Sequence, residues 1–273
     1  MNSTATNVFT LGSALAGGRE FACALLVAAC AFSSSAVGAD TKTQESAQGK
    51  LDTNSHRGLA PYEAVYKTST SGLSLKLKRS LSMDENGDCR LSSEGKLLVA
   101  GISEMSVFAV EGDRVQPKSY VYQLSGPISR RREVHFDPGS SVIRSLYKKD
   151  WYELPRTDVT LDRMSQQEQL RLSLLNDATP REDMSFTVAD GRKVKQYKLI
   201  YQGEERLETP MGWIKTLHFE RDHDDDDRRS AVWIAPDWDY LMVKTVHIDD
   251  GKTTEANLIS ASIDGDPVGG ASD

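Results

Sequence analysis

The sequence predicts a mainly β protein, built as one curved antiparallel sheet that is barrel-like or a sandwich and carries one amphipathic helix. Two observations support this fold class. Short runs of alternating apolar and polar residues recur along the chain, separated by turn pairs such as Asn-Gly and Asp-Gly. One longer segment, at about 160–176, breaks this rhythm with leucines at helical spacing.

The expected strands begin with Leu73–Leu77, where three leucines face one way and Ser and Lys face the other. Asn86-Gly87 is a tight-turn pair that joins this strand to the next one, at 90–99. Asp190-Gly191 is the strongest hairpin signal in the chain. Further strands are expected at 117–124, 131–136, 141–147, 184–188, 193–201, 213–221, 229–234, 240–248 and 253–260.

The helical segment carries its leucines among Gln, Glu and Arg, as an amphipathic helix does. Asp162 or Ser165 can cap its start, and Asn176 its end. A single helix between two groups of strands either packs across the open side of a sheet or covers an edge strand. Both placements remain open from the sequence.

The first 39 residues resemble an export leader. Arg19 precedes an uncharged apolar run of 12 residues, 21–32, which is too short to cross a bilayer that needs about 20. Small residues follow it, so we expect a signal peptide cleaved after Ala39. A second interpretation is a lipobox at 27–30, with lipidation of Cys30.

The rest of the chain divides into a flexible polar linker at 40–59, one antiparallel β domain at 60–262 and a disordered tail at 263–273. The chain has 33 basic and 40 acidic residues; Arg19 and Glu20 lie in the leader, which leaves 32 against 39. This acidic balance argues against a nucleic-acid partner. We expect an exported, periplasmic protein, or one anchored by lipid in the outer membrane, without a transmembrane helix in its mature form.

One cysteine, Cys89, remains after the leader is removed, so a disulfide within the mature domain is excluded. It follows a turn in a strand-like stretch, where a single thiol is expected to be buried and inert.

Histidine and carboxylate residues alternate at three places: at His247-x-Asp249 and in the two candidate sets, Glu133-x-His135-x-Asp137 and His218-x-Glu220. Side chains two apart on a strand share a face, so each set could hold a divalent metal or supply an acid and a base. The simpler interpretation is the polar face of a half-solvated sheet, because apolar residues occupy the alternate positions. We therefore expect no metal and no cofactor, and keep these five residues as candidates of low rank.

Other catalytic patterns are missing from the sequence. No Gly-x-Ser-x-Gly elbow or Gly-rich phosphate loop occurs. Glu204 and Glu205 are adjacent on a strand, so they point to opposite faces and cannot flank one glycosidic bond. The acidic run 222–227 has neither the ligand spacing nor the glycine of a calcium loop. No catalytic residue is expected, and an enzyme is the less favoured interpretation.

Several modest motifs are spread over 61–260: Pro61–Tyr66, Pro117–Tyr120, Phe136-Asp137, Asp162–Leu172, Gly203–Glu205, Thr209–Gly212 and Trp233–Asp237. Together they resemble the bacterial domain-of-unknown-function 3108 family of exported proteins. The resemblance implies export and a β-rich fold, and it brings no activity or catalytic residue. The chain departs from the family at 241–243, which is Leu-Met-Val where Leu-Pro-Val is expected.

Aromatic residues at strand ends, among them Trp151, Trp213, Trp233 and Trp238, line either a core or a ligand cleft. A curved sheet with a helix across its opening favours a non-enzymatic envelope module that binds a lipid-like, glycan or protein component. Two alternatives remain: a metal-assisted hydrolase that uses a His/carboxylate set, and a structural envelope lipoprotein. The ligand and the oligomeric state stay open.

Overall fold

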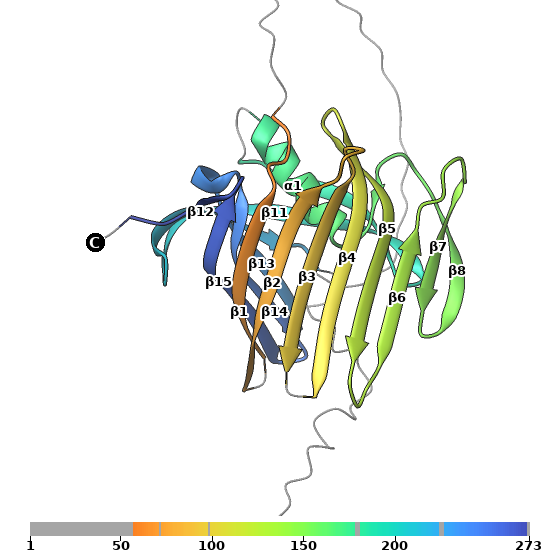
Figure 1. Ribbon diagram of the computed structural model, residues 1–273, viewed down its shortest axis with the longest axis horizontal. Helices are drawn as coiled ribbons and strands as arrows, with labels where there is room; N and C mark the ends of the chain where they lie inside the picture. Colours follow the sequence, from red (N-terminus) through yellow and green to blue (C-terminus); the bar gives the residue numbers. More distant parts are fainter. Residues whose placement is uncertain (1–56, 71, 98, 178–180, 224–226, 272–273) are drawn as a thin grey trace, which may run out of the picture.

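The computed structural model describes residues 57–70, 72–97, 99–177, 181–223 and 227–271. These residues form one large curved sheet with a single α-helix, α1, Ser165–Asn176 (Figure 1). The predicted mainly β fold with one helix is thereby confirmed. The candidate processing residues, Ala39 and Cys30, lie outside the described residues.

The sheet runs in the order β8-β7-β6-β5-β4-β3-β2-β1-β15-β14-β13-β12-β11-β10-β9, with β16 added beside β15. Every pairing is antiparallel except β9 with β10. The strands are β1 (Tyr62–Thr70), β2 (Leu73–Met83), β3 (Cys89–Leu97), β4 (Ala100–Glu111), β5 (Arg114–Ser125), β6 (Arg130–His135), β7 (Val142–Tyr147), β8 (Asp150–Pro155), β9 (Thr160–Leu161), β10 (Met184–Asp190), β11 (Lys193–Thr209), β12 (Gly212–Arg221), β13 (Arg228–Ala235), β14 (Leu241–Asp249), β15 (Lys252–Ile263) and β16 (Asp266–Pro267).

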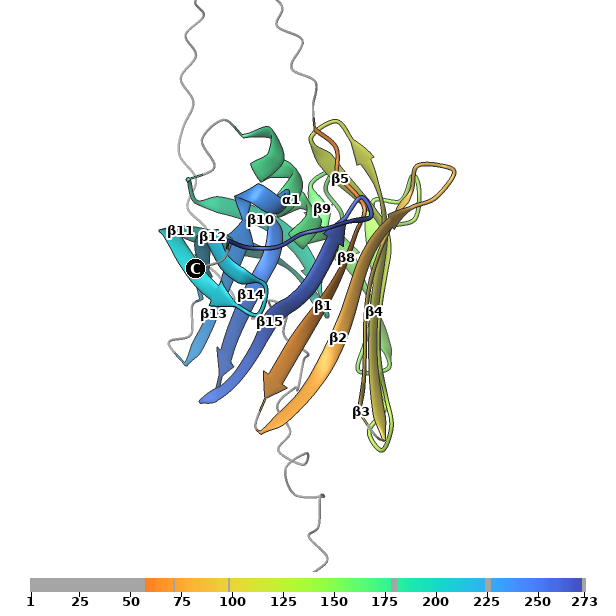
Figure 2. The same cartoon turned by 60° about the vertical axis from the view of Figure 1, so that its left-hand side comes forward.

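The sheet bends so that β2–β4 form one wall and β11–β15 the other, with α1 near one end between them (Figure 2). Large side chains from both walls, such as Phe108 and Phe219, are fully buried on the concave side, which is the inner face of the sheet. Within the described residues the two end strands, β8 and β9, do not pair. The sheet is therefore an open curve, neither a closed barrel nor a sandwich.

The ends of the sheet meet through side chains at a seam between β7–β8 and β10–β11. Ser145 Oγ donates a hydrogen bond of 2.6 Å to the carbonyl oxygen of Gly191. Gly191 has φ +64°, and a Cβ at this position would lie 3.1 Å from the ring of Tyr147. Glycine thus satisfies both the left-handed turn and the close approach.

The Asn86-Gly87 and Asp190-Gly191 turns are confirmed by the β2–β3 and β10–β11 pairings. The sequence did not indicate β4 or β8. The inner side of β4 carries the buried polar residues Glu104 and Ser106, so its apolar alternation is interrupted. The structure also contains β1, which opens the domain and pairs with β15 near the end of the chain.

The helix begins at Ser165, five residues after the expected start, because Thr160–Leu161 form β9 beside β10. The carboxylate of Asp162 accepts the backbone N–H groups of Met164 and Ser165, at 2.8 and 2.9 Å. The helix packs within the curve of the sheet, against β4 and β5. An amphipathic pattern predicts that the polar residues of the helix face solvent, but most of them are buried; Gln166 and Glu168 are at most 1% exposed.

Segments at both ends of the domain have defined contacts. Leu59, expected in the flexible linker, is buried in the core, and Arg57 bonds to Asn176. The expected disordered tail instead contributes β16, and Ala271 pairs with Trp213. Among the described residues, no helix has the length and apolar character needed to cross a membrane.

Candidate functional site

The first predicted His/carboxylate set lies around β6. The Nε2 atom of His135 is 2.8 Å from Glu133 Oε2, and Arg131 Nε donates to Glu133 Oε1 at 2.5 Å. Burial opposes ionisation of Glu133, but the hydrogen bonds from Arg131 and His135 outweigh it and lower its pKa. Asp137 pairs with Arg144 at 2.9 Å rather than with His135. The carboxylates of this set are thus engaged by arginines.

The second set lies on the outer face of β12. His218 Nδ1 is 2.7 Å from Glu205 Oε1, and its ring stacks on Trp233 with 4.3 Å between ring centroids. Trp233 Nε1 donates to the other oxygen of Glu205 at 3.1 Å, which completes what we call the Trp233 cluster (Glu205, His218 and Trp233). Glu220 is 3.6 Å from His218 Nε2 and is also paired with Arg229.

The two sets lie on separate strands, β6 and β12, that do not pair with each other. In the described parts of the chain, no three His, Cys, Asp or Glu side chains are grouped closely enough to hold a metal ion. Cys89 is buried, and burial raises the pKa of its thiol to about 11, so the thiolate is disfavoured.

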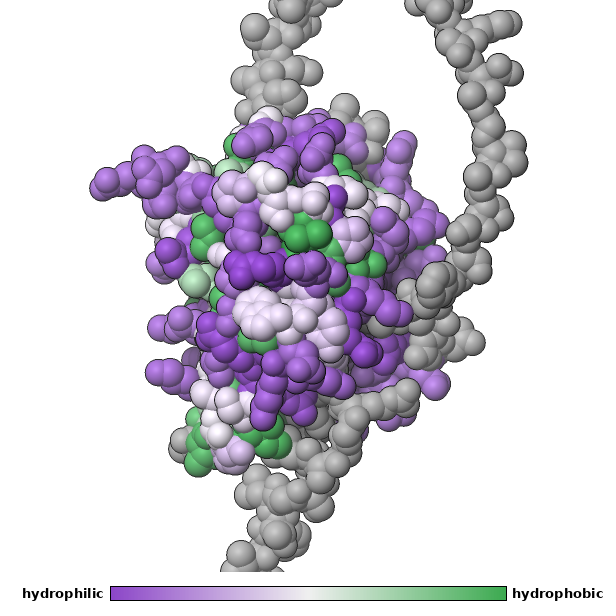
Figure 3. All heavy atoms as spheres, turned by 90° about the vertical axis from the view of Figure 1, so that its right-hand side faces the viewer, coloured by the Kyte–Doolittle hydropathy of each residue, from purple (hydrophilic) through white to green (hydrophobic). Residues whose placement is uncertain are grey.

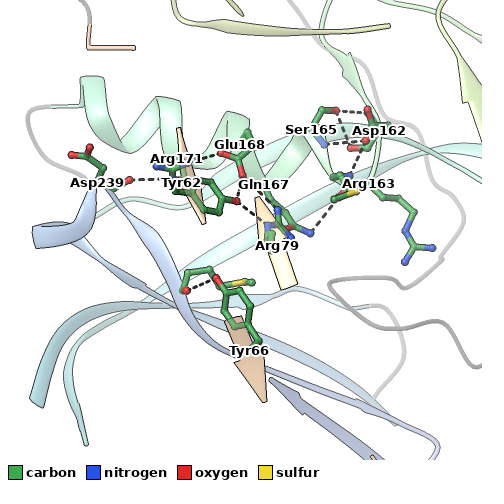
Figure 4. A network of polar contacts seen from close by, with 12 residues as sticks. Tyr62, Tyr66, Arg79, Asp162, Arg163, Ser165, Gln167, Glu168, Arg171 and Asp239 are labelled. Atoms are coloured by element: carbon green, nitrogen blue, oxygen red, sulfur yellow. Dashed lines mark hydrogen bonds and ion pairs between the residues drawn. The ribbon is translucent and has the colours of Figure 1, made fainter. Parts of the chain in front are cut away.

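A buried polar network that the sequence did not indicate lies on the inner face of the sheet, where α1 meets β1 and β2. We call Tyr62, Arg79, Glu168 and Arg171 the α1 network (Figure 4). Glu168 Oε1 accepts the Tyr62 hydroxyl at 2.9 Å, and Oε2 accepts Arg171 Nη1 at 2.7 Å. Arg79 Nε donates to the Tyr62 hydroxyl at 2.8 Å, and its Nη2 is 3.5 Å from Glu168.

The α1 network carries two guanidinium groups and one carboxylate. Burial raises the pKa of Tyr62 to about 12, because the phenolate is disfavoured more than the arginine charges favour it. Burial alone would lower the pKa of Arg171, but the charge of Glu168 outweighs this and raises it. Both arginines are therefore charged, Tyr62 is neutral, and one buried positive charge has no counter-charge within the network.

A second buried group lies at the start of α1 and joins it to the opposite wall. Arg163 Nη1 is 3.8 Å from Asp190 Oδ1, while Lys195 Nζ is 2.7 Å from Asp190 Oδ2. The Tyr197 hydroxyl donates to the same oxygen at 3.3 Å. Burial would raise the pKa of Asp190, but the charges of Arg163 and Lys195 outweigh it and lower the pKa to about 2.

Polar atoms without a hydrogen-bond partner concentrate around α1. Leaving such an atom unpaired in the interior costs about 1–3 kcal/mol, so nearly all buried polar groups bind protein, water or a ligand. Within the described chain, the atoms around α1 without a partner are Arg79 Nη1, Arg163 Nε, Gln166 Nε2, Gln166 Oε1, Gln167 Oε1 and Arg171 Nη2. The inner face beside α1 therefore retains unused hydrogen-bonding capacity, and we treat it as the candidate site.

Sequence reasoning missed this site because Gln, Glu and Arg on a leucine-rich helix ordinarily form its solvated face. One feature of the sequence could have indicated buried polar residues on this helix. Gln166, Gln167 and Glu168 are consecutive, so polar side chains occupy most of one helical turn and interrupt the apolar stripe.

No curated protein matches this chain. A solved structure of a β-barrel-like protein of the domain of unknown function DUF1849, from Brucella abortus, is similar with a TM-score of 0.47 and 10% identity, covering 75% of this chain and 98% of that one. A protein from Parabacteroides distasonis, whose description provisionally names it a lipoprotein, matches with a TM-score of 0.29 and 10% identity, covering 74% and 95%. The family described as "Protein of unknown function (DUF3108)" matches residues 84–256, which confirms the family expected from the motifs, and the chain belongs to it.

Proposed function

We propose that this chain is a non-enzymatic ligand-binding module of the cell envelope, and that its binding surface is the inner face of the curved sheet beside α1. The observation that carries the proposal is the group of buried, unpaired polar atoms on and around that helix. A ligand with matching donors and acceptors would satisfy them, and the hydrogen bonds gained would contribute directly to affinity.

One part of the outer surface, at the β7–β8 end, offers less support for binding. The face at the β7–β8 end is covered mainly by hydrophilic side chains, with only small, separate hydrophobic patches (Figure 3). Large contiguous apolar patches are what mark docking surfaces for proteins or membranes. This contrast favours the inner face as the site of recognition.

The chemistry of the His/carboxylate sets does not favour a hydrolase. Glu133 and Glu220 are each paired with an arginine, and a carboxylate held in this way is a weak base and a poor metal ligand. The ligand that we propose is therefore an envelope component, either lipid-like or a glycan.

The open edge of the sheet provides a route to the inner face. At the seam, side-chain contacts such as the one between Ser145 and Gly191 take the place of a strand ladder. Contacts of this kind open at lower free energy than a continuous ladder of backbone hydrogen bonds.

Native mass spectrometry of protein purified from its own cell envelope tests the proposal. We expect a co-purifying mass in the wild-type protein, with reduced occupancy in Gln166→Leu, which removes one unpaired donor and one unpaired acceptor. The exposed Gln196→Leu is the matched control and should keep the ligand. Ligand-free wild-type protein in repeated preparations would contradict the proposal.

The envelope location rests on the leader pattern, so the processed N-terminus is measured in the same experiment. Cleavage after Ala39 gives a free periplasmic domain that starts at Asp40, whereas a lipid-modified Cys30 gives a tethered one. An intact mass that retains residues 1–29 would contradict export by either route.

A further inference from the structure

We infer that the ligand of the inner face carries an acidic group, a carboxylate or a phosphate, that binds Arg79 and Arg171. This inference rests on the proposed function and deepens it. It starts from the charge of the α1 network, where two guanidinium groups share the single carboxylate of Glu168. The excess positive charge is buried, since both arginines are at most 4% exposed.

The hydrogen bonds that the two arginines make, and those that they leave unused, also indicate an acidic ligand group. Arg79 uses Nε on Tyr62 and Nη2 on Glu168, and Arg171 uses Nε on the backbone carbonyl of Asp239 and Nη1 on Glu168. Arg79 Nη1 and Arg171 Nη2 have no partner among the described residues. Each guanidinium therefore keeps a free N–H edge of the kind that binds carboxylate and phosphate oxygens.

An ordered water would satisfy these hydrogen bonds but would leave the excess charge opposed only by Asp239, whose carboxylate is 27% exposed and already pairs with Arg57. A buried charge without a counter-charge is strongly destabilising, and the cation–π contact of Arg171 over the Tyr62 ring, at 4.7 Å, offsets only part of that cost. An acidic group supplies both the acceptors and the missing negative charge. The overall charge of the chain is −7, so this positive interior is a local feature.

The arginines are also held in place before any ligand binds. The Tyr62 hydroxyl fixes Arg79, and the Asp239 carbonyl at 3.1 Å fixes Arg171. Side chains that are already ordered lose little entropy on binding, which favours a specific site over a transient contact.

Thermal-shift and calorimetric titrations of the full-length protein test the inference with five probes: inorganic phosphate, acetate, laurate, dodecyl phosphate and dodecanol. We expect the acidic probes to raise the melting temperature and dodecanol, which has the same chain without the acid, to leave it unchanged. A response to phosphate or acetate indicates a free anion as the natural source, whereas a response only to laurate and dodecyl phosphate indicates a lipid headgroup.

Variants of the network separate binding from a purely structural ion pair. Glu168→Gln removes the competing carboxylate and should bind the acidic probe about tenfold more tightly than the wild-type protein does. Arg171→Gln should weaken binding by about tenfold or more, and Arg171→Lys should recover part of it. The exposed Arg144→Gln, which loses its pair with Asp137 and its contact with the Trp151 ring, lies outside the α1 network; it is the control and should bind as the wild-type protein does.

Glu168→Gln also removes a buried counter-charge and is expected to be less stable, so the test does not depend on it alone. Arg171→Lys keeps the positive charge and should bind the acidic probe more tightly than Arg171→Gln and less tightly than the wild-type protein. Equal shifts for laurate and dodecanol, no shift with any acidic probe, or a Glu168→Gln variant that binds no better than wild type would each overturn the inference. A neutral co-purifying ligand without an acid response would overturn the acidic group alone and leave the binding function standing. Ligand-free protein without an acid response would overturn both.

Discussion

The α1 network and the Trp233 cluster combine similar groups in two different environments. In each, a glutamate contacts one nitrogen-bearing side chain and one aromatic residue. Glu168 contacts Arg171 and Tyr62, and Glu205 contacts His218 and Trp233. The glutamate side chain is 1% exposed in the first and 43% exposed in the second.

This difference in burial determines what each group contributes. Solvent screens the charge of Glu205, so its contacts contribute little net free energy. The charges beside α1 are desolvated, so every missing partner is costly and every added partner counts for more. Unmatched buried polar atoms around α1 are therefore costly, whereas the exposed carboxylate of Glu205 can be satisfied by solvent.

The largest expected effect comes from Glu168→Ala. Removal of the carboxylate leaves Arg79 and Arg171 buried without a counter-charge, and should lower the free energy of unfolding by about 3–5 kcal/mol. Urea denaturation measures this loss. Glu255→Ala, which removes the partly exposed partner of Lys244 and Asn257, is the control and should cost about 1 kcal/mol or less. Equal losses in the two variants would erase the distinction between the regions.

The next effect is a pH dependence that arises from Asp190. Its pKa in the folded protein is about 2, below the ordinary aspartate value of 3.8, so its ionised form stabilises the fold. This stabilisation is fully present above about pH 4 and is lost as the pH falls towards 2, for a total of roughly 2 kcal/mol. Unfolding measured across this range should decline less steeply in Asp190→Asn. Parallel pH profiles would show that the buried carboxylate is not held in this way.

The strand pattern could be predicted because alternation reports which residues face the core. The turns at Gly87 and Gly191 follow rules that act within a few residues. Leu77 is buried as the alternation predicts, although Leu73, at the start of the same strand, is 55% exposed. β4 was missed because its inner side carries Glu104, which bonds to Tyr120 across the β4–β5 pair. A polar residue satisfied by a partner distant in sequence leaves no local signal.

The candidate site was missed for the same reason on a larger scale. Tyr62 and Glu168 are separated by 106 residues, and no periodicity relates them. The His/carboxylate sets, in contrast, are visible in the sequence because their members are two residues apart. Short spacing made them recognisable, while the long-range pairing of charges around α1 became apparent only from the fold.

A smaller effect is expected from Trp233→Phe on the outer face. The phenyl ring can still stack on His218, but the hydrogen bond from Trp233 Nε1 to Glu205 is lost. An exposed hydrogen bond contributes about 1 kcal/mol at most, so the free energy of unfolding should fall by no more than this. Urea denaturation again supplies the measurement. A loss as large as that of Glu168→Ala would mean that the Trp233 cluster is an energetic centre of the fold.

The smallest expected effect is that of Glu133→Gln, in the other His/carboxylate set. The pKa of Glu133 is lowered by hydrogen bonds from Arg131 and His135, so its ionised form stabilises the fold above its unfolded-state pKa and this contribution is lost as the pH falls. Solvent reaches Arg131, whose side chain is 50% exposed, and screens the pair to about 0.5 kcal/mol or less. Urea denaturation at pH 7 and pH 3 should therefore barely distinguish Glu133→Gln from wild type, whereas Asp190→Asn differs clearly. The pKa is lowered in both carboxylates, Glu133 and Asp190, so both stabilise the fold when ionised. Their contributions to the free energy of unfolding would differ, because burial sets the strength of each charge pair.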